Sequence, residues 1–147
     1  MIGDTINQKI GEALKAHDEI RLSTFRLLSS AFNYEFIAKQ HKLSEDEEIV
    51  VVRKEAKKRK EAIEAYEKAG YKDRAEKEAK ELSILQEYLP PEISDDEITK
   101  LVDEAIKETN ATAISDMGKI IGFVKEKTKG AADGTKVALL VRQKLSL

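Results

Sequence analysis

The sequence predicts an all-α protein made of two helical bundles. Apolar residues recur at intervals of three and four almost throughout, and Ala, Glu, Lys and Leu are abundant. Only seven glycines and two prolines interrupt the 147 residues, and the alternation typical of strands is nearly absent. A chain of this length can bury a core in one large domain or two small ones.

The N-terminal part should form a four-helix bundle. Ser44, with Glu47 three residues on, forms a capping box that starts the third helix, and Gly70 is a plausible end for it. The expected helices cover residues 3–16, 18–41, 45–69 and 72–88. The apolar stripe of the second should comprise Phe25, Leu28, Phe32 and Phe36, widened by Leu27, Ala31 and Tyr34.

Pro90 and Pro91, the only prolines, mark a domain border because proline lacks an N–H donor and disfavours helix before it. Ser94 and Glu97 then form a second capping box. Three shorter amphipathic helices follow, over residues 95–108, 116–128 and 134–145. We therefore expect a four-helix domain at 1–90 and a three-helix domain at 91–147.

Charge is nearly balanced overall, at −2, but strongly patterned. Residues 91–115 hold two Lys and seven Asp/Glu, whereas residues 116–147 hold seven Lys/Arg and three Asp/Glu, so their net charges are −5 and +4. The block "RKEAKKRK" at 53–60 is also basic, but glutamates on the same helix offer i,i+4 partners that explain most of it. The C-terminal basic segment is the better candidate for binding a polyanion.

No constellation of catalytic residues is visible. A phosphate-binding loop around Gly118–Lys119 fails, because Ala113 occupies its first glycine position, Ile120 follows the lysine and no strand precedes it. There is no Cys, and His17 and His41 stand in polar settings near helix ends. The acidic clusters fall where negative charge favours a helix N-terminus. We expect no catalytic residue, metal or cofactor.

The sequence also lacks a signal peptide and a run of about 20 apolar residues, so we expect a cytoplasmic protein with no membrane contact.

Phe123 is the only aromatic residue after Tyr88, which favours recognition of a nucleic-acid backbone over base stacking. The candidate nucleic-acid-binding residues are Lys119, Lys125, Lys127, Lys129, Lys136 and Arg142.

Gly118 and Gly122 lie four residues apart and thus share one face of the sixth expected helix. Mid-helix glycine costs about 1 kcal/mol relative to alanine, so a compensating role is expected. Either another helix crosses closely there, which we favour, or an RNA or protein partner approaches the bare backbone.

Several segments resemble the YqeY-like proteins. The match is carried by "LQEYLPPEISDDEI" and "SDMGKIIGFVKEKTKGAADG", and also by "RLSTFRLLSSAFNYE" and "EDEEIVVVRKEAKKRKEAIEAY", so it spans essentially the whole chain. The resemblance implies a fold of two helical bundles. It points to D-M-G-K and G-x-A-D-G as family motifs, with a recognition or fold-defining role for Asp116, Met117, Gly118, Lys119, Gly130, Ala132, Asp133 and Gly134.

YqeY-like proteins are similar to the C-terminal tail of the B subunit of tRNA-dependent amidotransferases, which helps to hold tRNA while an upstream region carries out the chemistry. The resemblance therefore implies a non-catalytic module that binds tRNA or assists an amidotransferase. An alternative is a protein–protein adaptor with no nucleic-acid role. A third reading, a carbon-nitrogen ligase with glutamine as amido donor, has only family similarity behind it, since no residue here could carry that reaction.

Overall fold

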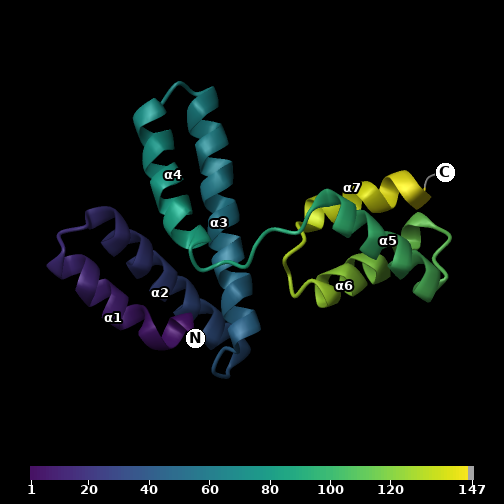
Figure 1. Cartoon of the computed structure of the whole chain (residues 1–147), viewed down its shortest axis with the longest axis horizontal. Coiled ribbons are helices and arrows are strands. Elements are labelled where there is room, and N and C mark those ends of the chain that lie inside the picture. Colours follow the sequence, from purple (N-terminus) through teal and green to yellow (C-terminus); the bar gives the residue numbers. More distant parts are fainter. Residues whose placement is uncertain (146–147) are drawn as a thin grey trace. The chain divides into compact units, whose positions relative to one another are not determined.

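The computed structural model describes residues 1–145, and within them the chain is all α-helical (Figure 1). The helices are α1 (Ile2–Lys15), α2 (Glu19–Lys39), α3 (Glu45–Lys68), α4 (Lys72–Gln86), α5 (Asp95–Thr109), α6 (Met117–Lys127) and α7 (Gly134–Leu145), with a short 3-10 turn, η1 (Ile114–Asp116), before α6. The all-α prediction is confirmed.

Local capping explains most of these boundaries. The Ser44 and Ser94 side chains accept the N–H groups of Glu47 and Glu97, and each glutamate carboxylate accepts the serine N–H in return. Both capping boxes thus form as the sequence predicts. Gly70, at φ +82°, follows the end of α3 and adopts the left-handed conformation that glycine accepts at little cost.

The chain separates into two compact units, Met1–Leu89 and the residues from Pro90 onward. Each unit has a hydrophobic core of its own. The buried apolar residues of the first are Ile6, Ala13, Phe25, Leu28, Phe32, Leu43, Val51, Val52, Ala56, Ile84 and Leu85. Those of the second are Ile98, Val102, Ala105, Ala111, Ile120, Val124, Val137 and Val141.

The first unit consists of two helical hairpins, α1–α2 and α3–α4. The four helices do not pack against a shared core along their whole lengths. The core of this unit uses only the first half of α3, up to Ala56, and the last part of α4, from Ile84. The distal part of the α3–α4 hairpin projects beyond α1 and α2 (Figure 1). At its tip the Arg74 guanidinium lies 5.8 Å from the Tyr66 ring and 5.1 Å from the Tyr71 ring. The regular four-helix bundle expected for residues 1–90 is not confirmed.

The predicted apolar stripe of α2 is only partly buried. Phe25, Leu28 and Phe32 enter the core as expected, but Leu27, Tyr34 and Phe36 are exposed. The prediction was wrong for these three residues because apolar side chains occur all around α2, so their spacing does not single out one inward face.

Candidate nucleic-acid interface

The D-M-G-K motif begins at Asp116, the last residue of η1, and continues into α6, which is anchored by its inward face. Ile120 and Val124 are fully buried in the core of the second unit, and Met117 packs against that core. The carboxylate of Asp116 accepts the backbone N–H groups of Thr112 and Ala113 at 3.2 and 3.4 Å. These two hydrogen bonds join Asp116 to the turn that leads into α6.

The end of α6 is a tight, hydrogen-bonded turn. Lys129 and Gly130 both have positive φ, +50° and +76°, and their N–H groups donate to the carbonyls of Glu126 and Lys125. This pattern is a Schellman motif. The buried hydroxyl of Thr128 donates to the Val124 carbonyl at 2.8 Å and accepts the Ala132 N–H at 3.3 Å. Gly130 therefore supplies a backbone conformation that α6 needs in order to end here.

The last residues of the G-x-A-D-G motif start α7. The Asp133 carboxylate accepts the Thr135 N–H at 3.0 Å, and its carbonyl accepts the Val137 N–H at 3.0 Å, as an N-cap residue does. Ala132 packs against the core, and Gly134 is the first residue of the helix. Asp133 and Ala132 thus make local contacts in the connection between α6 and α7.

Gly118 and Gly122 are exposed on the outer face of α6. Outside the backbone of α6 itself, no atom of residues 1–145 lies within 4 Å of the position that a Cβ would take at either glycine. The favoured prediction, that another helix of the chain crosses closely there, is therefore wrong. The bare backbone of these two residues faces outward, and within residues 1–145 no neighbouring element packs on it to offset the cost of glycine in a helix.

The lysines of α6 divide between two sides of the helix. Lys125 lies three residues after Gly122, and Lys119 lies three residues before it, so both flank the exposed glycines. Their side chains are exposed, and the ammonium of Lys119 is 4.0 Å from Asp116. Lys127 lies elsewhere, with its ammonium 5.5 Å from the centre of the half-buried Phe123 ring. The outer face of α6 is thus an open glycine pair bordered by Lys119 and Lys125, and also by the exposed Glu126, which lies four residues after Gly122.

Helix α7 contributes less free positive charge than the sequence suggests. The Lys136 ammonium lies 3.3 Å from the Asp95 carboxylate, and Lys144 pairs with Asp103. Both acids belong to α5, so the acidic helix neutralises part of the basic one. The sequence analysis did not identify these two acids as partners, because they lie 41 residues away along the chain. Arg142 is exposed on α7.

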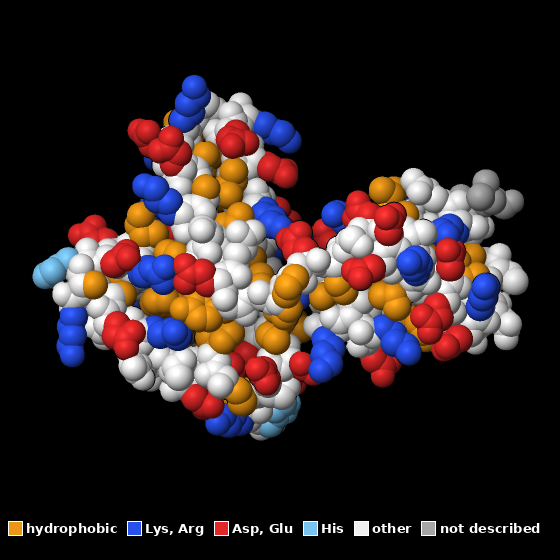
Figure 2. All heavy atoms as spheres, viewed as in Figure 1, with side chains coloured by type: hydrophobic (Ala, Val, Ile, Leu, Met, Phe, Trp, Pro, Cys, Tyr) orange, Lys and Arg blue, Asp and Glu red, His pale blue; other side chains and the backbone are white. Residues whose placement is uncertain are grey.

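The basic block at 53–60 belongs to a network of ion pairs. Arg59 Nε lies 2.8 Å from Glu81 Oε2 and 3.4 Å from Glu78 Oε2, and Lys58 pairs with Glu55 at 2.6 Å. Partners therefore come from α4 as well as from α3. On the face shown in Figure 2, Lys/Arg and Asp/Glu side chains are interspersed over the α3–α4 hairpin. This face of the hairpin is therefore not a uniformly positive surface.

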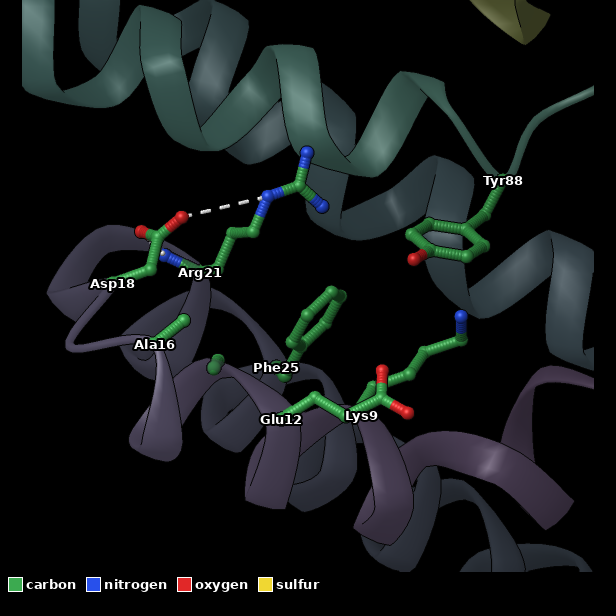
Figure 3. A pocket seen from close by; sticks show the side chains of 8 residues that line it. Lys9, Glu12, Ala16, Asp18, Arg21, Phe25 and Tyr88 are labelled. Atoms are coloured by element: carbon green, nitrogen blue, oxygen red, sulfur yellow. Dashed lines mark hydrogen bonds and ion pairs between the residues drawn. The ribbon is translucent and has the colours of Figure 1, made fainter.

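A cavity of about 210 Å³ lies among α1, α2 and the end of α4 (Figure 3). Arg21 donates to both oxygens of Glu87, which raises the pKa of Arg21, and the Lys9 ammonium lies 5.0 Å from the Tyr88 ring centre. Phe25 meets Tyr88 edge to face at 6.0 Å. The cavity is smaller than most pockets that hold a drug-sized ligand. Of its charged groups, Arg21 lies 3.6 Å from Asp18, and Glu12 accepts a hydrogen bond from Gln8.

Among residues 1–145 no three His, Asp or Glu side chains converge in an arrangement that could hold a metal ion. No helix in the same range combines the length and the apolar character needed to cross a bilayer.

Comparison with known proteins identifies the family. A family model described as "Yqey-like protein" matches residues 3–145, nearly the whole chain. An uncharacterized protein of Schizosaccharomyces pombe is 30% identical over 89 residues, which cover 60% of this chain and 72% of that protein. The D-M-G-K and G-x-A-D-G motifs fall inside the matched range. This chain belongs to the YqeY-like family.

Proposed function

We propose that the protein is a non-catalytic accessory module that binds tRNA through the outer face of α6, alone or beside an amidotransferase. The observation that carries the proposal is the exposed Gly118–Gly122 backbone with Lys119 and Lys125 at its borders. Without a Cβ at these two positions, a phosphate–sugar backbone can come closer to the helix than at other residues. Lysines at the borders then neutralise phosphates.

The chemistry of this face favours recognition of shape and backbone. Phe123, the one aromatic residue on α6, packs against the core and is covered by Lys127, so it does not present a ring for base stacking. Folded RNA offers phosphates and 2′-hydroxyl groups that can be contacted without unstacking bases. The similarity of YqeY-like proteins to the tail of the amidotransferase B subunit supports tRNA as the RNA concerned.

The alternative functions have less support. A protein–protein adaptor that uses the glycines and Phe123 would need that ring exposed, whereas it lies against its own core. A stoichiometric partner that co-purifies after nuclease treatment would favour the adaptor. For a carbon-nitrogen ligase, conversion of mischarged tRNA by the isolated protein with glutamine and ATP would be the deciding observation.

The test is binding of labelled tRNA to the purified protein, measured by fluorescence anisotropy over a series of salt concentrations. We expect affinity to fall linearly with salt on a double-logarithmic plot. Replacing Lys119 and Lys125 by Gln should flatten the slope by about one unit per lysine. Lys129 is left unchanged because its left-handed backbone is part of the turn after α6.

A matched control removes the same charge from another helix of the same unit. Lys100 and Lys107 are exposed on α5, and the variant Lys100→Gln/Lys107→Gln should keep the wild-type slope. Equal losses in both variants would show that binding follows net charge and not the α6 face. If the wild-type protein binds no tRNA near physiological salt, the proposal is wrong.

A further inference from the structure

The outward face of α2 is uncharged in a chain where 37% of residues carry charge. Leu27, Tyr34 and Ile37 are 49%, 80% and 69% exposed. Between Leu27 and Ala38 the only charged residue is Glu35, which lies toward α3 and pairs with Lys54 at 3.7 Å. Large exposed apolar side chains gathered on one helix face mark a surface that meets another molecule.

The spacing on this face is that of a helix-pairing seam. Leu27, Ser30, Tyr34 and Ile37 follow one another at intervals of three, four and three residues, and the half-buried Ser23, four residues before Leu27, continues the pattern within α2. An average interval of 3.5 residues is the repeat that keeps two supercoiled helices in contact. Because Phe25, Leu28 and Phe32 point to the core, α2 has one packing face inward and a second one outward.

We propose that this outward face pairs with the same face of a second copy of the chain, with the two α2 helices antiparallel. A two-fold axis between Ser30 and Tyr34 places Ser30 opposite Tyr34 of the second copy and Leu27 opposite Ile37 of the second copy. Each large ring then meets a small side chain. A parallel pair would instead place Tyr34 against Tyr34 and Ser30 against Ser30. The two rings would then be overpacked, and the two small serines would leave a void between the helices.

The charges beside the seam are compatible with this pairing. Arg26 falls at the C-terminal end of α2 of the second copy, where the uncharged Gln40 ends the helix, and Asn33 and Ala31 fall beside their own equivalents near the axis. No two like charges meet, and no ion has to be buried without a partner. Self-complementarity is what a two-fold interface requires, since the same patch serves both copies.

The expected dimer is reversible. Helix α2 has 21 residues, and at 1.5 Å per residue it is about 31 Å long. A single helix pair of that length lies at the low end of specific interfaces. Sedimentation velocity over a series of protein concentrations should therefore show a monomer–dimer equilibrium.

The first test changes the most exposed residue of the seam. Tyr34→Glu should weaken dimerisation at least about tenfold, the loss typical of a central aromatic residue. Leu139→Glu, on the exposed face of α7, adds the same charge away from the seam and should leave dimerisation unchanged. Since both side chains are exposed, both variants should keep the wild-type thermal midpoint. A wild-type protein that stays monomeric at every concentration would overturn the proposal.

The second test examines the antiparallel register, and it is clean because the chain has no Cys. Under mild oxidation, Leu27→Cys and Ile37→Cys should each stay uncrosslinked alone, because their equivalents lie far from the axis. Mixed together they should form a disulfide dimer, since residues 27 and 37 are then opposite each other. Crosslinking of either single variant alone would contradict the antiparallel arrangement, and so would the absence of crosslinks in the mixture.

Discussion

Arg59 of α3 and Glu81 of α4 form a largely buried ion pair. Nε of Arg59 lies 2.8 Å from Oε2 of Glu81, and the two side chains are 14% and 6% exposed. Glu78 approaches the same guanidinium at 3.4 Å. Thus one arginine lies at ion-pair distance from two carboxylates of the protruding hairpin, although Nε of Arg59 and Oε2 of Glu78 make no hydrogen bond.

Removing that arginine should destabilise the first unit strongly. In Arg59→Ala two carboxylates remain in place without their cation, and breaking a buried pair in this way typically costs about 3 kcal/mol or more. The free energy of unfolding from urea titration measures the loss. The double variant Arg59→Met/Glu81→Met, which removes both charges, should recover much of it. Equal midpoints for Arg59→Ala and wild type would contradict the assigned role.

Glu47 should make stability depend on pH in the acidic range. The hydrogen bond from the Ser44 N–H, followed by that from the Lys39 ammonium, lowers the pKa of Glu47 from 4.5 to about 2. Because folding lowers this pKa, the stabilisation is present above about pH 4.5 and is lost as the pH falls toward 2.

Glu47→Gln tests this because glutamine can keep the capping hydrogen bonds but does not titrate there. Thermal midpoints of the variant should lie below those of the wild type at neutral pH and converge with them near pH 2. A constant difference across this range would show that the charge of Glu47 contributes nothing.

Gly122→Ala separates stability from recognition. The added methyl group has open space, and alanine favours helix over glycine by about 1 kcal/mol, so the variant should be more stable than the wild type. It should nevertheless bind tRNA more weakly if a backbone approaches α6 closely. Gly11→Ala is the control, because Gly11 is also mid-helix, in α1, with open space around it. There the gain in stability should come with unchanged affinity.

Thr128 should be essential for the turn between α6 and α7 through its hydroxyl. In Thr128→Val the shape is retained, but the Ala132 N–H loses its acceptor, at a cost of about 1–3 kcal/mol for an unsatisfied group. Thr128→Ser keeps the oxygen and should lose less. Chemical denaturation of the two variants compares them, and a serine variant less stable than the valine one would point to the methyl group instead.

Much of the fold can be predicted from the sequence because its signals are local. Capping boxes at Ser44 and Ser94 and the glycine after α3 fix helix ends within a few residues. The inward face of α2 could not be predicted, since its apolar residues surround the helix. Burial there depends on where α1, α3 and α4 pack, which periodicity alone does not contain.

In the candidate site, too, local features could be predicted from the sequence, whereas features that depend on packing between helices could not. That Gly118 and Gly122 share a face follows from helical spacing, but whether anything covers that face depends on helices elsewhere in the chain. Likewise, the pairing of Lys136 and Lys144 with Asp95 and Asp103 requires α5 and α7 to be neighbours. A count of charges along the sequence therefore overstates the positive potential of α7.

The protruding part of the α3–α4 hairpin sets an order of opening within the first unit. Between Ala56 and Ile84 only the partly buried Leu82 of this hairpin packs against the main core, and at the tip Arg74 lies beside two tyrosine rings. Amide protons there should exchange with solvent through local unfolding that leaves α1 and α2 intact. Protection should decrease along α3 from Val52 toward Gly70 and rise again along α4. The tip of the hairpin should therefore unfold first, while the residues at its base stay folded until the whole unit unfolds.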